Sequence, residues 1–152
     1  MSNPRIHEWL QGGTSIIVAT ADADGVPATC RGIAMSAAPD LQTVTVYLPA
    51  TTAHETLANI ATTRRMAVAA SHPLSHSTVQ IKGVTRGVKM AGPADEPFVT
   101  AQWQQFTDVL AELGLPRRVT HRVVHWPAFA IELSVEQVFD QTPGPNAGAP
   151  LT

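Results

Sequence analysis

The chain has 152 residues, which fits one domain, and a domain of about this size buries roughly 68–70% of the surface exposed by its unfolded chain. Apolar residues make up 44% and charged residues 14%, a composition that excludes global disorder. The net charge is −2 and no more than two Lys or Arg residues are adjacent, so neither nucleic-acid binding nor binding to an anionic membrane is indicated.

The compartment is indicated by cysteine usage and by the apolar runs. The single cysteine, Cys30, excludes an internal disulfide and lies in an alternating pattern typical of a small core residue. No apolar run approaches eighteen residues, and no basic stretch followed by an apolar run begins the chain. We therefore expect a cytoplasmic protein. The low charge also favours an oligomer that hides apolar surface.

The first elements are a helix and a strand. Residues 4–12 read as a short helix that Gly12 and Gly13 end. The β-branched run over residues 14–20 predicts a strand, and residues 22–25 (DADG) have the composition of a tight turn.

Two further strands and a helix follow. The pattern predicts strands over residues 27–36 and 41–48, the second alternating polar with apolar residues. Thr52 and Glu55 then stand at the spacing of a capping box, in which the Thr hydroxyl accepts a free backbone N–H and the Glu reaches back. The helix that they begin lasts about ten residues.

The middle of the chain returns to strand. Residues 66–70 predict a strand, and residues 78–90 predict a long alternating one. Gly83 and Gly87 in the long strand indicate the bulges or bends that barrel corners require.

The last part begins with a helix that Asp95 caps and that Gly114 ends. A final strand or bent pair of strands covers residues 128–139. Residues 142–150 are too rich in Pro and Gly for regular structure, so this tail either lies across a site or a partner or is disordered. The expected buried stripe of the helix is Val99, Trp103, Phe106, Leu110 and Leu113.

These elements predict a mainly β chain with helices, in which six antiparallel strands close into a barrel. Closure removes the exposed edges that an open sheet would leave. Side chains alone fill so narrow a barrel, so we expect any ligand on its outside or at an interface between subunits.

The order and spacing of several segments resemble those of the pyridoxamine 5′-phosphate oxidase-like family of FMN-binding split barrels. The likeness runs from about residue 13 to residue 141. The segments that carry it are the hairpin 24–27 leading into the strand with Arg31, the strand–helix–strand 41–70, the strand 78–83 (TVQIKG) and the closing 135–139 (VEQVF).

The resemblance implies a six-stranded antiparallel split barrel over residues 1–141, followed by the tail 142–152. It also implies a homodimer with FMN at the subunit interface. FMN is the implied cofactor, and haem or a deazaflavin is the less favoured alternative on the same scaffold.

In the family an Arg on the second strand helps to hold the flavin phosphate, and Arg31 stands at that position. Ile33 and Ser36 on the same strand are further candidate cofactor contacts. Ser36 stands where the family usually has a Lys.

The start of the helix after residue 51 is a second candidate for the phosphate, because free amides and the helix dipole favour an anion there. Thr51, Thr52 and His54 surround this terminus. The family usually has Ser-Arg-Lys-like residues here, whereas this chain has His54-Glu55-Thr56. Thr52 is equally well explained as a plain helix cap, and the two roles are compatible.

Thr78, Gln80 and Lys82 share one face of the long strand and are the candidates for hydrogen bonds to the flavin ring; a solvent-facing stripe is the alternative. A positive charge such as Lys82 near the ring would stabilise a reduced, anionic flavin.

Ala130 stands where the family has its pyridoxal-phosphate-binding Arg, so we do not expect pyridoxamine-phosphate oxidase activity itself. The implied function is that of a related flavin-dependent oxidoreductase, with no catalytic acid or base assigned. The alternatives are a non-catalytic flavin-binding or regulatory module, or a haem or deazaflavin binder. His54, His72 and His76 lack the companions and spacing of a metal site, and none is expected.

Overall fold

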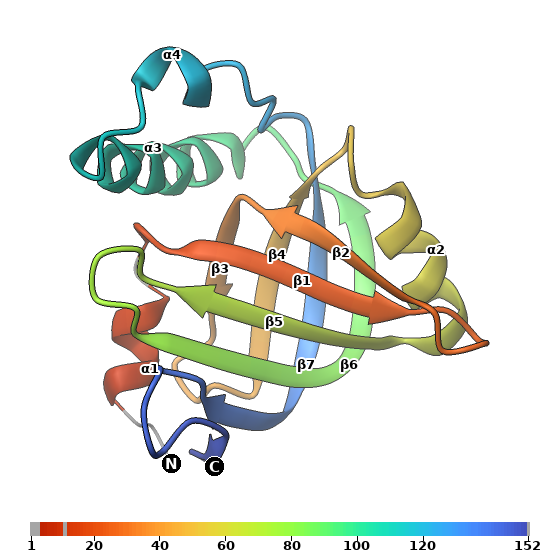
Figure 1. Ribbon diagram of the computed structural model, residues 1–152. Helices are drawn as coiled ribbons and strands as arrows, with labels where there is room; N and C mark the ends of the chain where they lie inside the picture. The colour runs from red at the N-terminus through yellow and green to blue at the C-terminus, as the bar shows by residue number, and fades with distance from the viewer. Residues whose placement is uncertain (1–3, 11, 152) are drawn as a thin grey trace.

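In the computed structural model, which describes residues 4–10 and 12–151, seven antiparallel strands pair in one curled sheet with helices outside it (Figure 1). The helices are α1 Pro4–Trp9, α2 His54–Thr63, α3 Glu96–Glu112 and α4 Arg117–Thr120. The strands are β1 Ser15–Ala21, β2 Pro27–Gly32, β3 Ala34–Ala37, β4 Thr43–Pro49, β5 Arg65–Ser71, β6 Thr78–Met90 and β7 Ala128–Asp140.

The sheet closes because its two edges belong to one stretch of chain. The strand order is β2-β1-β5-β6-β7-β4-β3, so the first and last strands are consecutive in sequence and only Ile33 separates them. The N–H of Ile33 donates to the carbonyl of Tyr47 at 3.0 Å. The antiparallel barrel is therefore confirmed, and the strand predicted over 27–36 is split in two, which makes seven strands of the expected six.

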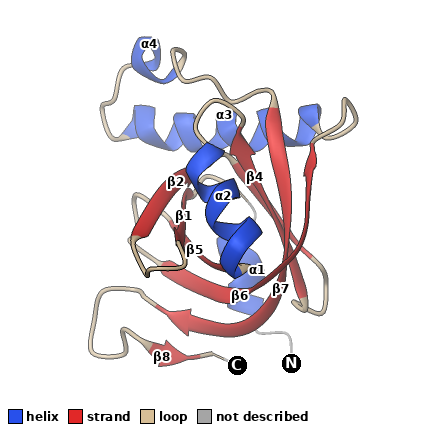
Figure 2. Cartoon of the chain, turned by 90° about the vertical axis from the view of Figure 1, so that its right-hand side faces the viewer, coloured by secondary structure: helices blue, strands red, loops and turns tan. Residues whose placement is uncertain are grey.

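The interior of the barrel is filled by side chains, which alternate with outward-facing ones along strands such as β1, β2 and β5. The burial of β2 alternates residue by residue, with Ala28, Cys30 and Gly32 buried and their neighbours exposed. Figure 2 shows the strands wrapped around this interior, with α2 alongside them and α3 across one end. The largest fully buried side chains of this core are Ile6, Met35, Leu48, Ile81, Ile131 and Leu133.

The capping box predicted for α2 does not form. Ala53 is the residue that precedes the helix; it has helical backbone angles, and no side chain caps it. Thr52 instead lies against Cys30, with its hydroxyl 3.6 Å from the thiol sulfur. A contact with the barrel thus takes the place of the local capping bond.

The long strand β6 has the predicted bounds and the predicted bulges. Its register with β7 shifts between Lys82 and Gly83 and again between Thr85 and Gly87. At Gly83 the carbonyl oxygen of Ser134 comes so close that an added Cβ would lie 1.9 Å from it. Glycine is therefore required there by the neighbouring backbone.

Helix α3 packs on the outside of the barrel over a second, smaller core. Val99, Trp103 and Phe106 are buried there against residues of β3, β4 and β7. Leu113, which was expected in this stripe, is 54% exposed because it follows the end of the helix. Asp95 does not cap α3 with its side chain; its carboxylate accepts the N–H of Gly92 at 2.9 Å.

A buried side chain of α3 joins the helix to the edge of the sheet. Gln102 accepts the N–H of Met35 at 2.9 Å and donates to the carbonyl of the same residue at 3.0 Å. These two bonds imitate the pairing that a neighbouring strand would give to β3. Gln102 also lies 3.5 Å from the carbonyl of Leu10, just after α1.

The tail contains more regular structure than its composition predicted. Ala149 and Pro150 form a short strand, β8, that pairs with β7, and the N–H of Leu151 donates to the carbonyl of Val138 at 2.8 Å. Helix α1 ends before the predicted residue 12. In the described ranges, no helix combines the length and apolar character needed to span a membrane.

The bonds of Gln102 make a prediction about stability. Replacing Gln102 with Ala leaves the buried N–H and C=O of Met35 without partners, and we expect a loss of roughly 2–4 kcal/mol in the free energy of unfolding. Urea denaturation measures it. The exposed Gln104 on the same helix is the control, and Gln104→Ala should change stability by less than about 0.5 kcal/mol. Equal effects would contradict the proposed bridging role.

The two glycines of β6 make a second prediction. Gly83→Ala forces the Ser134 carbonyl to move and should cost roughly 1–3 kcal/mol of stability. No atom lies within 4 Å of a Cβ added at Gly87, so Gly87→Ala should change stability by less than about 0.5 kcal/mol. Thermal denaturation of both variants is the test; a larger loss for Gly87→Ala would show that the close approach is wrongly assigned.

Candidate functional site

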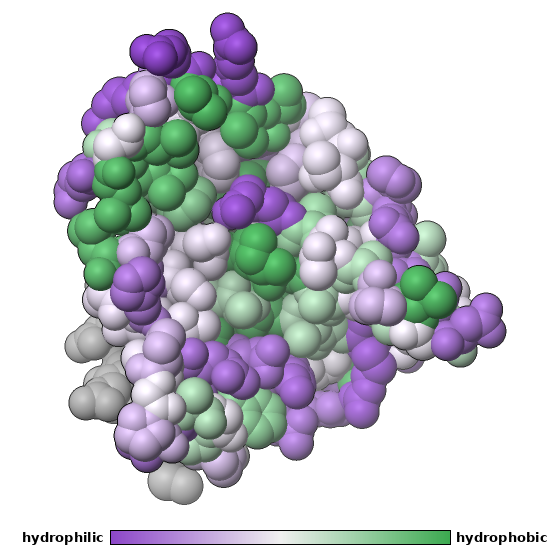
Figure 3. Space-filling model, viewed as in Figure 1, coloured by the Kyte–Doolittle hydropathy of each residue, from purple (hydrophilic) through white to green (hydrophobic). Residues whose placement is uncertain are grey.

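A cavity of about 580 Å³ opens between α3, α4 and the ends of the strands near them; we call it the α3 cavity. Helices and strand ends supply opposite walls, so the cavity is outside the barrel. Figure 3 shows hydrophobic surface gathered over the α3 and α4 region, at the upper left. The lining residues are Ser15, Arg31, Ser71, His72, Pro73, His76, Thr78, Trp103, Phe106, Leu110, Leu115, Val119, Thr120, Val123 and Pro143.

Arg31 supplies the positive charge of this cavity. Among the described lining residues it is the only Lys or Arg, and none is Asp or Glu. Its guanidinium donates to the hydroxyl of Ser15 at 3.1 Å and lies 5.6 Å from the centre of the Phe106 ring. No carboxylate among the residues that the structure describes forms an ion pair with it. Arg31 therefore keeps donors free for an anion.

Thr78 stands at the start of β6 and lines the same cavity. Its hydroxyl lies 2.9 Å from that of Ser71, and its N–H donates to the hydroxyl of Thr142 at 3.0 Å. The N–H of Gln141 donates to the carbonyl of Thr78 at 2.8 Å. These bonds from β5 and from the tail fix Thr78 and add hydroxyl groups to a largely apolar wall.

Two imidazoles lie on the rim. His72 is half-buried and its Nδ1 accepts the N–H of Ser75 at 3.4 Å, while His76 is exposed and has a positive φ of 59°. They belong to the loop between β5 and β6. Among the described residues, no three His, Cys, Asp or Glu side chains lie close enough to hold a metal ion.

An aromatic row continues from the cavity into the helices. The rings of Phe106 and Trp103 have centres 5.7 Å apart, and Trp103 stacks on His125 at 6.3 Å with an interplanar angle of 15°. Nε2 of His125 is 3.2 Å from the Thr100 hydroxyl. Trp103 thus lies between the α3 cavity and a second cavity on the α4 side, and lines both.

The residues predicted around the start of α2 are separated from Arg31. Successive side chains of a strand point to opposite faces. On β2, Cys30 therefore faces Thr52, whereas Arg31 faces Ser15 and the cavity. Thr51, Thr52 and His54 are exposed and do not line the α3 cavity.

The other predicted residues also lie outside the cavity. Ile33 is 3% exposed and packs under α3, and Ser36 is half-buried in β3 opposite Thr45. Gln80 accepts a hydrogen bond from Gln141 at 3.4 Å. Of the nine predicted residues, the structure brings Arg31 and Thr78 together at one cavity.

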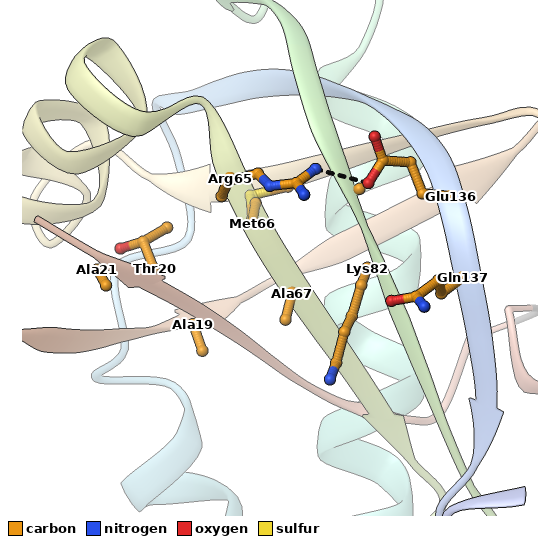
Figure 4. A pocket seen from close by; sticks show the side chains of 10 residues that line it. Ala19, Thr20, Ala21, Arg65, Met66, Ala67, Lys82, Glu136 and Gln137 are labelled. Atoms are coloured by element: carbon orange, nitrogen blue, oxygen red, sulfur yellow. Dashed lines mark hydrogen bonds and ion pairs between the residues drawn. The ribbon is translucent and has the colours of Figure 1, made fainter. Parts of the chain in front are cut away.

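Lys82 lies in a different, shallow cavity of about 280 Å³ on the outer face of β1, β5 and β6 (Figure 4). Its ammonium is 5.0 Å from the centre of the Phe139 ring. At the same cavity Arg65 and Glu136 form an ion pair of 2.6 Å. Small alanine side chains line part of this cavity, and Glu136 neutralises Arg65. Lys82 therefore lies apart from Arg31 and Thr78, which share the α3 cavity.

The surroundings of Tyr47 alter the pKa of its phenol. Burial, together with the Asp95 carboxylate beside it, raises the pKa of the Tyr47 phenol above its usual value of 10.0. The phenol therefore stays protonated at neutral pH and donates to Asp95 at 3.3 Å. It lies on the β4 side of α3, next to Phe98, away from the α3 cavity.

Sequence reasoning missed most of the cavity wall. Leu110 was read as part of a buried stripe, and Leu115, Val119, Val123 and Pro143 were not singled out. An amphipathic pattern does not distinguish a side chain that packs in a core from one that borders a cavity. Arg31 was found because a resemblance marked its position.

The cavity fits a ligand with a flat apolar body and one anionic group. Its volume lies within the range of roughly 300–1,000 Å³ typical of cofactor sites. Arg31 matches a phosphate or carboxylate, and the hydroxyls of Ser15, Ser71 and Thr78 match polar edges.

In the comparison with protein families, residues 2–141 match the family model described as pyridoxamine 5′-phosphate oxidase. No curated protein sequence is significantly similar to the chain.

Solved structures with the same fold include three of different description. HupZ from Group A Streptococcus is 20% identical, with 97% of this chain and 100% of that chain covered and a TM-score of 0.59. A protein described as an F420 reductase is 11% identical (87% and 94% covered, TM-score 0.56). HutZ, described as the haem storage protein from Vibrio cholerae, is 16% identical (91% and 93% covered, TM-score 0.50). At these identities the likeness establishes the fold.

Proposed function

This chain belongs to the pyridoxamine 5′-phosphate oxidase family, and we propose that it binds FMN in the α3 cavity and acts as a flavin-dependent oxidoreductase. The observation that carries the proposal is Arg31. An arginine that has no carboxylate partner among the described residues stands on the wall of a largely apolar cavity of about 580 Å³. Such an arrangement suits a ligand that combines a flat ring system with a single phosphate.

The chain's own residues would hold and orient the cofactor. Arg31 would donate to the phosphate, and Thr78, with the hydroxyls beside it, would bond the polar parts of the ligand. The side chains of α3 and α4 would exclude water from the ring. The bound flavin supplies the electron chemistry, so no catalytic acid or base is required of the protein.

Exposed apolar residues near the cavity support a homodimer that covers it. Leu113, Leu115, Val123 and Val124 are 38–54% exposed at the ends of α3 and α4. Burying such side chains in a second subunit is favourable. The cofactor-binding domain would span residues 1–141, with the tail contributing Pro143 to the wall. The lone buried Cys30 supports a reducing, cytoplasmic compartment.

Haem is the second candidate, favoured by His72 and His76 on the rim of the same cavity. A neutral imidazole is a common iron ligand, and Arg31 would then pair with a carboxylate. HutZ, which shares the fold, is described as a haem storage protein, and the F420 reductase favours a deazaflavin in the same way. With either ligand, the α3 cavity would hold haem or a deazaflavin in place of FMN.

The proposed role of Arg31 makes a prediction about FMN affinity. Purified protein should bind FMN, and Arg31→Ala should weaken binding by about 1.5–3 kcal/mol, a factor of roughly 10 to 150, because a charge-assisted bond to phosphate is lost. Titration followed by flavin fluorescence measures it.

Arg86→Ala is the matched control, because Arg86 is an exposed arginine on β6 whose side chain bonds Ser134. It should leave FMN affinity unchanged. An Arg31→Ala variant that binds FMN like the wild type would remove Arg31 from the site, and a wild type that binds none would refute the proposal.

Absorbance spectra of the ligand-bound protein separate an enzyme from a passive binder, and FMN from haem. With FMN bound, a nicotinamide reductant should bleach the flavin absorbance faster than it bleaches free FMN.

If haem is the ligand instead, haemin binding should give a Soret band that shifts in His72→Ala or His76→Ala, whereas His54→Ala should leave it unchanged. FMN binding with no acceleration would support the non-catalytic module.

A further inference from the structure

A groove of about 350 Å³ runs between helix α2 and the second half of strand β6; we call it the α2 groove. Figure 1 shows the two elements side by side at the right of the molecule. The groove shares no lining residue with the α3 cavity, and none of the nine predicted site residues lies in it. A ligand bound here would therefore occupy a site separate from that of the proposed cofactor.

The apolar side chains of the α2 groove are aliphatic. Leu57, Ile60 and Ala61 come from α2, and Val88 comes from β6. Val88 is 44% exposed, and covering an apolar side chain of this kind is favourable. Among the described residues that line the groove none is aromatic, in contrast to the α3 cavity. This surface suits an aliphatic chain better than a flat ring system.

The charge of the groove is positive. Of its described lining residues two are arginines, Arg64 and Arg86, and none is acidic. Neither arginine forms an ion pair with a described residue. On the neighbouring strand β7, Glu136 pairs with Arg65, and Glu132 lines a different cavity. Both positive charges of the groove are therefore available to an anion.

Arg64 is fixed at the end of α2 by contacts with β6. Its φ of 56° lies in the left-handed region, where the end of a helix favours glycine. Its carbonyl accepts the N–H of Thr85 at 2.8 Å, and its guanidinium donates to the carbonyl of Thr85 at 3.3 Å. The two bonds hold the guanidinium beside the strand.

Arg86 follows Thr85 at the second bulge of β6. The register with β7 shifts between Thr85 and Gly87, and bulges commonly redirect a side chain. Nη2 of Arg86 donates to the hydroxyl of Ser134 at 3.4 Å, and the other N–H groups of this guanidinium have no partner among the described residues. Because the guanidinium of Arg64 lies at the carbonyl of the preceding residue, both positive charges belong to the part of the groove near the bulge.

We propose that the α2 groove is a second binding site, for an aliphatic carboxylate such as a medium-chain fatty acid. Arg64 and Arg86 would donate to the carboxylate, and the chain of the ligand would lie over Val88 and the aliphatic side chains of α2. Charge-assisted bonds and the burial of apolar surface would both favour binding. The inference stands on α2 and β6 alone and does not rest on the proposed function.

The experiment is a calorimetric titration of the whole protein with three probes. Octanoate should bind at least about tenfold more tightly than octan-1-ol, which has the same chain length without the charge. It should also bind at least about tenfold more tightly than acetate, which has the same head group and no chain to bury. Added salt should weaken octanoate binding. An affinity for octanoate no greater than that for either of the other probes would overturn the proposal.

Variants of the two arginines locate the binding. Arg64→Gln/Arg86→Gln should weaken octanoate binding about tenfold or more, because two charge-assisted contacts are lost. Arg86→Gln alone should weaken it about threefold or more, and this exposed residue tests the site without a change at the end of α2. The matched control, Arg118→Gln/Arg122→Gln, removes two exposed positive charges outside the groove and should bind octanoate like the wild type. Equal losses in the two double variants would contradict the assignment.

Arg31→Ala separates the α2 groove from the α3 cavity, which also combines an arginine with apolar side chains. We expect this variant to bind octanoate like the wild type, and Arg64→Gln/Arg86→Gln to bind FMN like the wild type, because the two sites share no lining residue. Octanoate binding that is lost in Arg31→Ala and kept in the double variant would place the ligand in the α3 cavity and overturn this inference. A wild type that binds octanoate in the groove but no FMN would uphold it and refute the proposed function alone.

Discussion

The fold depends on the way one stretch of chain serves as both edges of the sheet. β2 and β3 lie at opposite ends of the strand order, yet only Ile33 separates them, so the sheet must curl until its edges meet. Although the edges meet at Ile33, β2 and β3 do not pair with each other in the described residues, so the outer backbone of β3 needs other partners, and Gln102 of α3 supplies them at Met35. The buried amide of Gln102 bonds both the backbone N–H and the carbonyl of Met35, and so holds α3 against β3 where the barrel closes. Helix α3 in this position supplies one wall of the α3 cavity.

The same stretch of chain sets the position of Arg31. Alternation along β2 turns Cys30 into the barrel and Arg31 outward, and α3, held at the neighbouring β3, puts Phe106 beneath the guanidinium. Barrel closure and the presentation of a cation to the α3 cavity are therefore consequences of one local geometry. In a split barrel whose interior is filled, such an outer wall is where a ligand can be accommodated.

Much of the fold was predictable because alternation along strands is a local signal. The bounds of β6 and its bulges at Gly83 and Gly87 could be read from sequence. The capping box at Thr52 could not, because contact with Cys30, far away in sequence, replaced the local bond. In the site, Arg31 and Thr78 do meet, whereas Thr52 and His54 do not join them, since strand parity and sheet order decide which residues face each other. Leu113 was wrongly predicted to be buried because the helical spacing of apolar residues continues in the sequence past Glu112, where α3 ends.

The C-terminal residues have a consequence for how this scaffold diversifies. The segment from Thr142 onward lies beyond the part of the chain that the family model matches, yet it holds Thr78 and places Pro143 on the wall of the α3 cavity. β8 and Leu151 attach its far end to β7. Pro143 thus brings a residue from outside the matched range to the wall of the cavity, in a segment that hydrogen bonds hold at Thr142 and at Leu151. Changes in length or composition there would reshape this part of the cavity while leaving the seven main strands of the barrel intact.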